Sequence, residues 1–222
     1  MNQHPGVIGR KLGMTQVFAD DGSVVACSVV EARPVVVAKR TKEKDGYDAL
    51  VLGEGEAKEK LVLRPVAGFF KKAGLGAKRT LREFRCSAEF AAKFEVGHEL
   101  KVEELFEEGQ FVDVQGISRG RGFTGVMRRH NFGGGVRTHG THEYKRHGGS
   151  IGTNMTPGRT LAGVGMPGHS GAVTMSVLNQ PIVKLVPEDG LILIRGGVPG
   201  AKNGLVLVRG AIKRDGGKPK GK

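Results

Sequence analysis

The chain has 222 residues, of which 38% are hydrophobic and 26% are charged, so it can bury a domain-sized core and is neither a linker nor a peptide. Its formal net charge is +13 and its pI is about 10.0, a balance typical of a soluble protein that binds a polyanion. The longest apolar runs, at 34–38 and 191–194, have four or five residues. A membrane-spanning helix needs about 20, which excludes a helical transmembrane protein.

The N-terminal stretch and the cysteines indicate the compartment. MNQHPGVIGRKLGM has neither the apolar segment of a secretory signal nor the Arg- and Ser-rich helix of a transit peptide, so we expect a cytoplasmic protein. Cys27 and Cys86 are isolated thiols without a CxxC pattern. We therefore predict buried reduced cysteines rather than a disulfide framework or a zinc site.

The first part of the chain is predicted to be strand-rich and then helical. VVACSVVEA (24–32) and PVVVAKR (34–40) have the β-branched content of strands, and ADDGS (19–23) supplies an Asp-Gly turn, so a β-meander is expected. Between residues 65 and 96, FFKKAG, LREF and AEFAAKF place apolar residues three and four apart. That spacing predicts a short helical insertion.

Strand patterns return in the second half. FVDVQGI (111–117) and the chain from Val173 onward are predicted strands, and LILIR (191–195) and LVLVR (205–209) resemble each other closely enough that we interpret them as a hairpin. VEELFEEGQ (102–110) is expected to be a solvated helix or turn face. The tail, 213–222, carries five basic residues and Asp215 and is expected to be a solvated basic arm. The fold is therefore predicted to be mainly β.

Residues 117–171 differ in composition from the rest. They contain 15 glycines, five histidines and no apolar period, which is typical of a functional or disordered loop. Seven of the chain's 17 arginines lie here but only one of its 18 lysines, Lys145, and the one acid is Glu143. Because the planar guanidinium donates paired hydrogen bonds to phosphate and stacks on bases, this choice of arginine indicates nucleic acid contact.

The candidate RNA-binding side chains are the cations of this segment and its histidines, which can stack on bases or bond to phosphate oxygens. They are Arg119, Arg121, Arg128, Arg129, His130, Arg137, His139, His142, Lys145, Arg146, His147, Arg159 and His169. Glycine permits close backbone approach to a partner. The candidates for such an approach are Gly120, Gly122, Gly125, Gly133, Gly134, Gly135 and Gly149.

Two sequence patterns in this segment are partial matches to enzyme motifs. Gly120, Gly122 and Gly125 form a GxGxxG, but a dinucleotide site needs a long helix next, and three glycines follow within ten residues of Gly125. His142, Glu143 and His147 read HExxxH rather than the HExxH of zinc proteases, and a glycine-rich stretch does not sustain a helix. We predict no catalytic residues, no metal and no cofactor.

Several separated blocks resemble, in order, the bacterial form of the large-subunit ribosomal protein three family. They are GRKLGMTQVF, FVDVQGISRGRGFTGVMRRHNF, THG, GGSIG, TPGR and RGGVPGAKNGLVLVRGAIK. The resemblance covers nearly the whole chain. It implies a β-barrel with short helices and a long irregular Gly/Arg-rich extension, in which residues 1–116 and 172–212 form the barrel body and 117–171 form an rRNA-binding loop.

The resemblance also implies a function. Family members are structural components of the large ribosomal subunit in the cytoplasm. They bind its rRNA early in assembly, contact ribosomal proteins fourteen and nineteen, and extend a basic loop toward the peptidyl transferase centre without catalysing a reaction. Some carry a methylated glutamine in the block that here reads GSIGTNMTPG; no glutamine occurs in residues 149–158, so that modification is not expected.

Two other classes remain open on sequence alone. A basic architectural protein that binds DNA outside the ribosome would share the charge and the arginines, and competition between RNA and DNA would distinguish it. A metal- or nucleotide-dependent enzyme would need a defined pocket and a measurable affinity for one of those groups. We predict no membrane partner and no small-molecule substrate.

Overall fold

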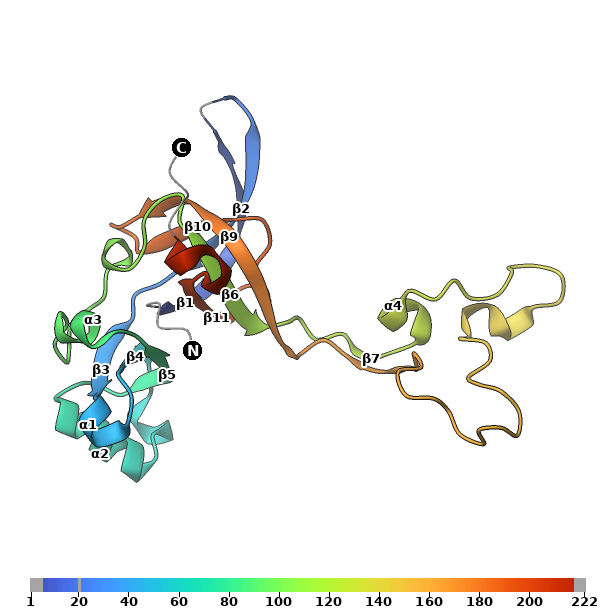
Figure 1. Ribbon diagram of the computed structural model, residues 1–222, viewed down its shortest axis with the longest axis horizontal. Helices are drawn as coiled ribbons and strands as arrows, with labels where there is room; N and C mark the ends of the chain where they lie inside the picture. Colours follow the sequence, from blue (N-terminus) through green and yellow to red (C-terminus); the bar gives the residue numbers. More distant parts are fainter. Residues whose placement is uncertain (1–5, 20, 218–222) are drawn as a thin grey trace. The chain divides into compact units, whose positions relative to one another are not determined.

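The computed structural model describes residues 6–19 and 21–217. They divide into two units. The barrel unit contains the described residues up to Ile117 and from Thr174 onward, and the basic unit is Ser118–Val173. The chain therefore leaves the barrel unit after one strand and re-enters it at the start of another (Figure 1).

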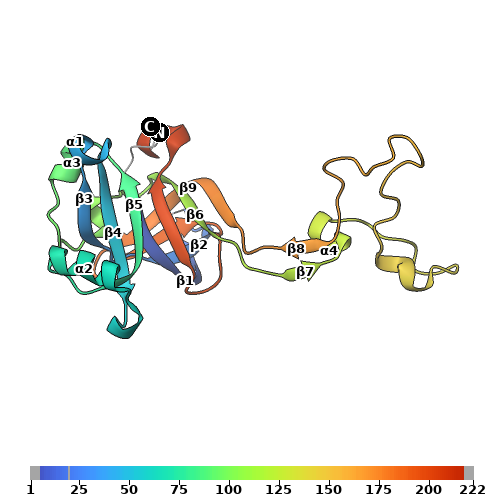
Figure 2. The ribbon, with the colours of Figure 1, turned by 90° about the horizontal axis from the view of Figure 1, so that it is seen from below.

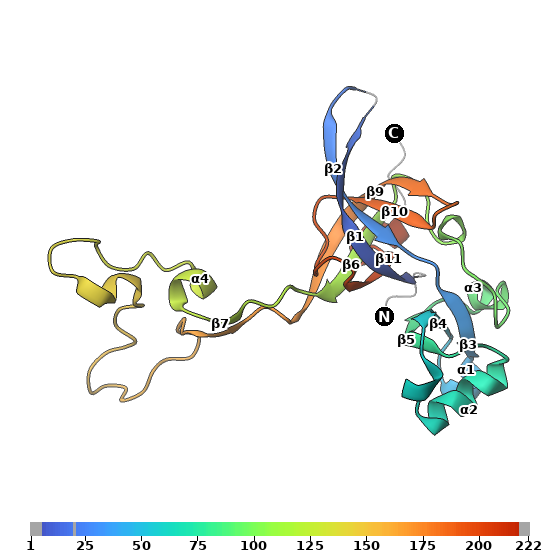
Figure 3. The ribbon, with the colours of Figure 1, turned by 180° about the vertical axis from the view of Figure 1, so that it is seen from behind.

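A closed barrel of six antiparallel strands forms the centre of the barrel unit. Its order is β1-β11-β6-β9-β10-β2. The strands are β1 (Gly6–Phe18), β2 (Val24–Glu31), β6 (Phe111–Ile117), β9 (Thr174–Val186), β10 (Leu191–Arg195) and β11 (Leu205–Gly210). Strands β1 and β2 stay paired as far as Phe18 and Val24 and continue past the other strands as a hairpin (Figure 3). The predicted mainly β class and the barrel are confirmed.

Every barrel strand supplies aliphatic side chains to one hydrophobic core. Because side chains alternate across a strand, a β-branched residue at every second position fills the interior. The contributors include Ile8, Val30, Val112, Val114, Ile182, Ile192, Ile194, Val206 and Val208. Each of them is at most 1% exposed.

A second, three-stranded sheet shares this core. It has the order β3-β4-β5 and consists of β3 (Val35–Arg40), β4 (Ala49–Glu56) and β5 (Lys78–Arg85). Val36, Leu50, Leu52 and Phe84 from this sheet belong to the same cluster as the barrel side chains, and Figure 2 shows the sheet beside the barrel. The barrel and the small sheet therefore form one continuous packed body.

Short helices occupy the connections of the barrel unit. They are α1 (Lys42–Asp45), η1 (Glu59–Leu61), α2 (Arg64–Ala73), α3 (Ala88–Ala92), η2 (Val102–Glu104) and η4 (Ile212–Gly217). Helix α2 has Pro65 in its first turn and is followed by the C-cap Gly74, whose φ of 68° is left-handed, and both features are common at helix boundaries. Within the described residues, no helix is long and apolar enough to span a membrane.

Two local predictions about the first half were wrong. LREF lies in strand β5 rather than in a helix, because its register against β4 places Phe84 in the shared core. Gly6 makes room for that ring, since a Cβ at Gly6 would meet the Phe84 ring atoms. The expected meander is also divided: β2 joins the barrel, whereas β3 begins the second sheet.

The prediction that LILIR and LVLVR form a hairpin was wrong as well. These stretches are β10 and β11, and two strands separate them in either direction around the barrel. Strand β10 pairs with β2 and β9, and β11 pairs with β1 and β6. The two sequences resemble each other because each strand presents two aliphatic side chains to the same interior from opposite walls.

The remaining expectations for the barrel unit had mixed outcomes. Cys27 and Cys86 are free and buried, as predicted. Leu105 and Phe106 are buried core residues, so the acidic stretch 102–110 is not wholly solvated. In the tail, residues up to Gly217 form η4 with the Arg214 guanidinium 4.1 Å from the Phe111 ring centroid, and 218–222 lie outside the described residues.

A partly buried ion pair connects β1 to β4. Arg10 Nε donates to Glu54 Oε1 at 2.9 Å, and the Glu54 side chain is 10% exposed. Gly55 has a φ of 67°, a left-handed conformation that favours glycine, and a Cβ there would lie 2.6 Å from an Arg10 guanidinium nitrogen, so a larger residue would also displace the end of the Arg10 side chain. Burial raises the pKa of the Glu54 carboxyl above its ordinary 4.5, although Arg10 acts in the opposite direction.

This raised pKa predicts a pH dependence of stability. The folded chain holds the Glu54 proton more tightly than the unfolded chain, so the stability contributed by this group falls as pH rises from about 4.5 through the higher folded pKa. We expect the free energy of unfolding of the native chain, minus that of Glu54→Gln, to decrease between about pH 4 and about pH 8 in urea titrations. Glu56→Gln, at an exposed position of the same strand, is the control and should give a flatter difference.

Candidate nucleic-acid interface

The basic unit begins where β6 and β9 stop pairing. Ile117 pairs with Thr174, after which the Ser118 amide donates to the Val173 carbonyl at 2.9 Å and the Ala172 amide donates to the Ser118 carbonyl at 3.1 Å. Beyond these bonds the unit contains β7 (Gly122–Thr124), α4 (Val126–His130), η3 (His142–Arg146) and β8 (Gly168–Ser170). The segment therefore has more local structure than its composition predicts.

Gly171 is the most crowded glycine of this unit. A Cβ at Gly171 would meet the Arg119 carbonyl oxygen and also lie 3.0 Å from Gly120 Cα, and its φ is 75°. The outgoing and returning chains therefore touch through main-chain atoms at this point. A side chain here would both strain the backbone and separate the two chains.

Gly171→Ala should loosen the pairing of the outgoing and returning chains without destabilising the barrel. We expect faster hydrogen exchange at the Ser118, Arg121 and Ala172 amides and an unchanged melting temperature, because no residue of the barrel core is displaced. Gly149→Ala is the matched control: its φ is also 75°, but nothing lies within 4 Å of the added Cβ. Equal exchange in the two variants would show that backbone strain alone, rather than the close approach, is responsible.

Helix α4 is attached to the returning chain at Met166. Arg129 Nη1 donates to the Met166 carbonyl at 2.7 Å, and His130 Nε2 lies 3.1 Å from the same oxygen. A carbonyl only accepts, so His130 must carry its proton on Nε2 to make this bond. Gly165 and Gly168 permit the contact, since a Cβ at either would lie 2.9–3.1 Å from the His130, Phe132 or Arg129 side chains.

The chain around η3 folds back on the glycine run before it. The Gly135 amide donates to the Lys145 carbonyl at 3.0 Å, and a Cβ at Gly134 would meet that same oxygen. The rings of Tyr144 and His147 are in edge-to-face contact with centroids 4.7 Å apart. Glycine at 134 is therefore explained by contact within the protein.

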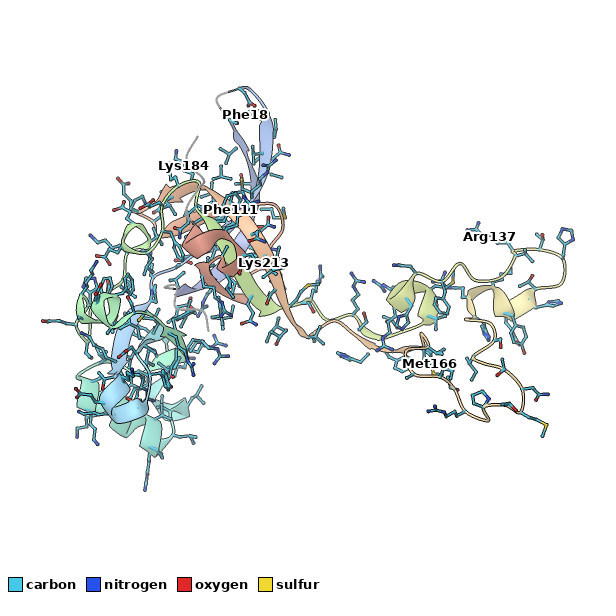
Figure 4. All side chains as sticks on the ribbon, viewed as in Figure 1. Phe18, Phe111, Arg137, Met166, Lys184 and Lys213 are labelled. Carbon is cyan, nitrogen blue, oxygen red and sulfur yellow. The ribbon has the colours of Figure 1, made fainter. Side chains whose placement is uncertain are left out.

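All thirteen side chains predicted to bind RNA are solvent-exposed. They include seven arginines and one lysine, and the segment contains only one acidic residue, Glu143. Among the side chains that the structure describes, the ion pairs between arginine and a carboxylate include those of Arg10 and Arg40, both in the barrel unit. The described cations of the basic unit make no ion pair within the protein, although Arg129 donates to the Met166 carbonyl, so their charge is available to an external polyanion. Figure 4 labels Arg137 and Met166 of this unit.

The seven predicted glycines differ in what surrounds them. Gly134 and Gly135 contact the chain around Lys145, whereas a Cβ at Gly122, Gly125, Gly133 or Gly149 would meet nothing within 4 Å. Of the open positions, Gly122 and Gly149 have φ values of 68° and 75°, so backbone conformation accounts for them. Gly120 would place a Cβ 3.5 Å from Ala172, which is ordinary contact.

The GxGxxG and HExxxH patterns lie in and beside short elements of the basic unit. Helix α4, which follows Gly120, Gly122 and Gly125, has five residues. His142 and Glu143 lie in η3, and His147 follows it. Over the part of the chain that the structure describes, no three His, Cys, Asp or Glu side chains gather in a way that could hold a metal ion.

Sequence reasoning missed several residues that shape this unit. Phe132 and Tyr144 are aromatic residues interleaved with the cations, a pattern typical of RNA-binding surfaces that could have drawn attention to them. Gly165 and Gly171 could not have been found from the sequence, because their importance depends on chain segments that lie 33 or more residues away, such as Phe132 and Arg119.

Comparison with known proteins places the chain in a family. The family described as Ribosomal protein L3 matches residues 83–190. Curated proteins named Large ribosomal subunit protein uL3 are similar over nearly the whole chain. The one from Sorangium cellulosum is 64% identical over 98% of this chain and 94% of its own length. Those from Brachyspira pilosicoli and Myxococcus xanthus are each 49% identical over 94% of this chain and 94% and 93% of their own lengths. The chain therefore belongs to the ribosomal protein L3 family.

Proposed function

We propose that this chain is a structural, non-catalytic component of the large ribosomal subunit, located in the cytoplasm, and that it binds large-subunit rRNA through the basic unit. The observation that carries the proposal is the exposure of eight arginines and lysines against one acid in Ser118–Val173. Membership of the ribosomal protein L3 family supports rRNA as the polyanion.

The packing of the two units supports a division of roles. The hydrophobic core contains residues of the barrel unit alone, whereas in Ser118–Val173 the buried side chains are those of Thr124 and Val126. A segment with so little buried apolar surface gains little folding free energy by itself. Many simultaneous contacts with phosphates can supply the free energy that orders it. The barrel would then act as the anchor and the basic unit as the RNA-binding element.

The finer parts of the proposal rest on the family. We infer that the chain joins the subunit early in assembly, that its neighbours are ribosomal proteins fourteen and nineteen, and that the basic unit approaches the peptidyl transferase centre. The thirteen exposed side chains predicted from the sequence are the proposed rRNA contacts. The glycines with empty surroundings, Gly125 and Gly133 among them, are the proposed places of close backbone approach.

The proposal is tested by asking whether the tagged chain enters large subunits in cells. We expect it to co-sediment with large subunits and to remain there in high salt, because an assembled protein is held by many contacts at once. A chain that washes off in high salt, or that prefers duplex DNA over rRNA in competition, would instead be a basic architectural protein.

A further inference from the structure

A small hollow lies within the basic unit, between the glycine run and η3. Its volume is about 420 Å³, and its walls are Phe132, Gly133, Gly134, Gly135, Tyr144, His147, Gly148 and Gly149. Five of these eight residues are glycine, so much of the wall is main chain. Peptide N–H and C=O groups in a wall can donate to and accept from the edge of a planar polar ligand.

Three rings complete the wall. Tyr144 and His147 are in edge-to-face contact, and Phe132 lies 6.1 Å from His130, centroid to centroid. Tyr144 is 63% exposed although it borders the hollow, so most of its ring is available to a ligand. Aromatic side chains of this kind bind unstacked nucleobases, since every base has a face that can stack.

Two glycines of the wall pack closely against neighbouring side chains. A Cβ at Gly148 would lie 3.2 Å from Val126 and 3.5 Å from Phe132, and one at Gly135 would lie 3.3 Å from Thr141. The bond from the Gly135 amide to the Lys145 carbonyl holds the two sides of the hollow together. The aromatic and main-chain walls are therefore positioned within the protein by its own contacts.

The charges around the hollow select for a nucleic acid. Exposed basic side chains lie close in sequence to the residues that line it: Arg128 and Arg129 precede Phe132, Arg137 follows the glycine run, and Lys145 and Arg146 lie between Tyr144 and His147. A polynucleotide that inserts one base between the rings would place its neighbouring phosphates among these cations. A free apolar ligand would gain nothing from them.

We propose that this hollow is a nucleobase pocket, which receives one unpaired base of the RNA while the surrounding arginines and lysine bind the flanking phosphates. The inference rests on the proposed RNA-binding function and makes it more specific. Most phosphate contacts in the unit are independent of base pairing, whereas this contact requires a base outside a helix. The basic unit should therefore prefer RNA with a bulged or looped nucleotide.

Three RNA hairpins test the pocket with the full-length chain: one fully paired, one with a single-nucleotide bulge, and one in which the bulged nucleotide is abasic. The bulged and abasic hairpins carry the same phosphates and differ by one base. We expect the native chain to bind the bulged hairpin about 5-fold to about 150-fold more tightly than the abasic one, the range that stacking of one base supplies. Tyr144→Ala should remove this preference, and Tyr144→Phe should retain it because the ring remains.

Phe123→Ala is the matched control, since Phe123 is an aromatic residue of the same unit, 78% exposed and outside the hollow. It should keep the preference for the bulged hairpin. Equal affinity of the native chain for the bulged and abasic hairpins would overturn the pocket while leaving RNA binding in place. If Phe123→Ala and Tyr144→Ala lose the preference for the bulged hairpin to the same extent, the proposed pocket is also overturned. Failure to bind any of the hairpins would reject the proposed function itself.

Discussion

A chain in which a short Gly-Ser linker replaces residues 121–165 should fold as stably as the native chain and yet fail to enter large subunits normally. The barrel core contains no residue of Ser118–Val173, so the replacement removes none of its buried contacts. Shortening a loop alters its closure entropy by only about 0.6 kcal/mol for each halving of length. We therefore expect the free energy of unfolding to change by no more than about 1 kcal/mol.

Incorporation of the linker variant into large subunits should decrease strongly. The replacement removes Arg121, Arg128, Arg129, Arg137, Lys145, Arg146 and Arg159, which are seven of the eight basic residues of the unit. Loss of that many phosphate contacts reduces affinity for RNA by several orders of magnitude at physiological salt. Sedimentation of reconstituted subunits and their peptidyl transfer activity are the measurements, alongside thermal and urea unfolding of the free protein.

Leu52→Ala provides the opposite control. Leu52 is fully buried in the shared core, and truncation of such a side chain lowers the free energy of unfolding by about 2–5 kcal/mol. It should therefore destabilise the barrel while leaving all cations of the basic unit in place. If the linker variant unfolds like Leu52→Ala, the basic unit is part of the folding core and the division of roles is wrong.

RNA binding by the native chain should weaken steeply as salt is added. If all eight cations of the basic unit displace counterions, the slope of log K against log salt is roughly −7 for a duplex and roughly −6 for a single strand. A fourfold increase in salt then lowers affinity by about three to four orders of magnitude. Filter binding or fluorescence anisotropy over a salt series measures this slope directly.

Single substitutions assign the slope to the basic unit. Arg137→Ala, at an exposed position, should make the slope less steep by about 0.7–0.9. Lys44→Ala removes the same charge from helix α1 of the barrel unit and should change the slope less. A native slope shallower than about −2, or equal effects of the two substitutions, would mean that the basic unit does not make most of the phosphate contacts.

Much of the strand content could be predicted because it depends on local pattern. FVDVQGI alternates valine with polar residues at 112–115, and LILIR is a run of four aliphatic residues, and both stretches form strands with the predicted bounds. The buried thiols of Cys27 and Cys86 were also predictable, from their isolation. Strand β5 was not, because its apolar residues also fit a helical spacing and only pairing with β4 decides between the two.

The amino-acid sequence alone determined where the charge lies and which stretches can become strands, because these are properties of residue types along the chain. The tertiary structure decided which strands pair, and it separated β10 from β11 because closing a six-stranded barrel brings other strands to their edges. It also decided that Arg129 and His130 hold Met166, and that Phe132, Tyr144 and His147 surround one hollow. Contacts between residues distant in sequence depend on the path of the whole chain, and no local pattern contains that path.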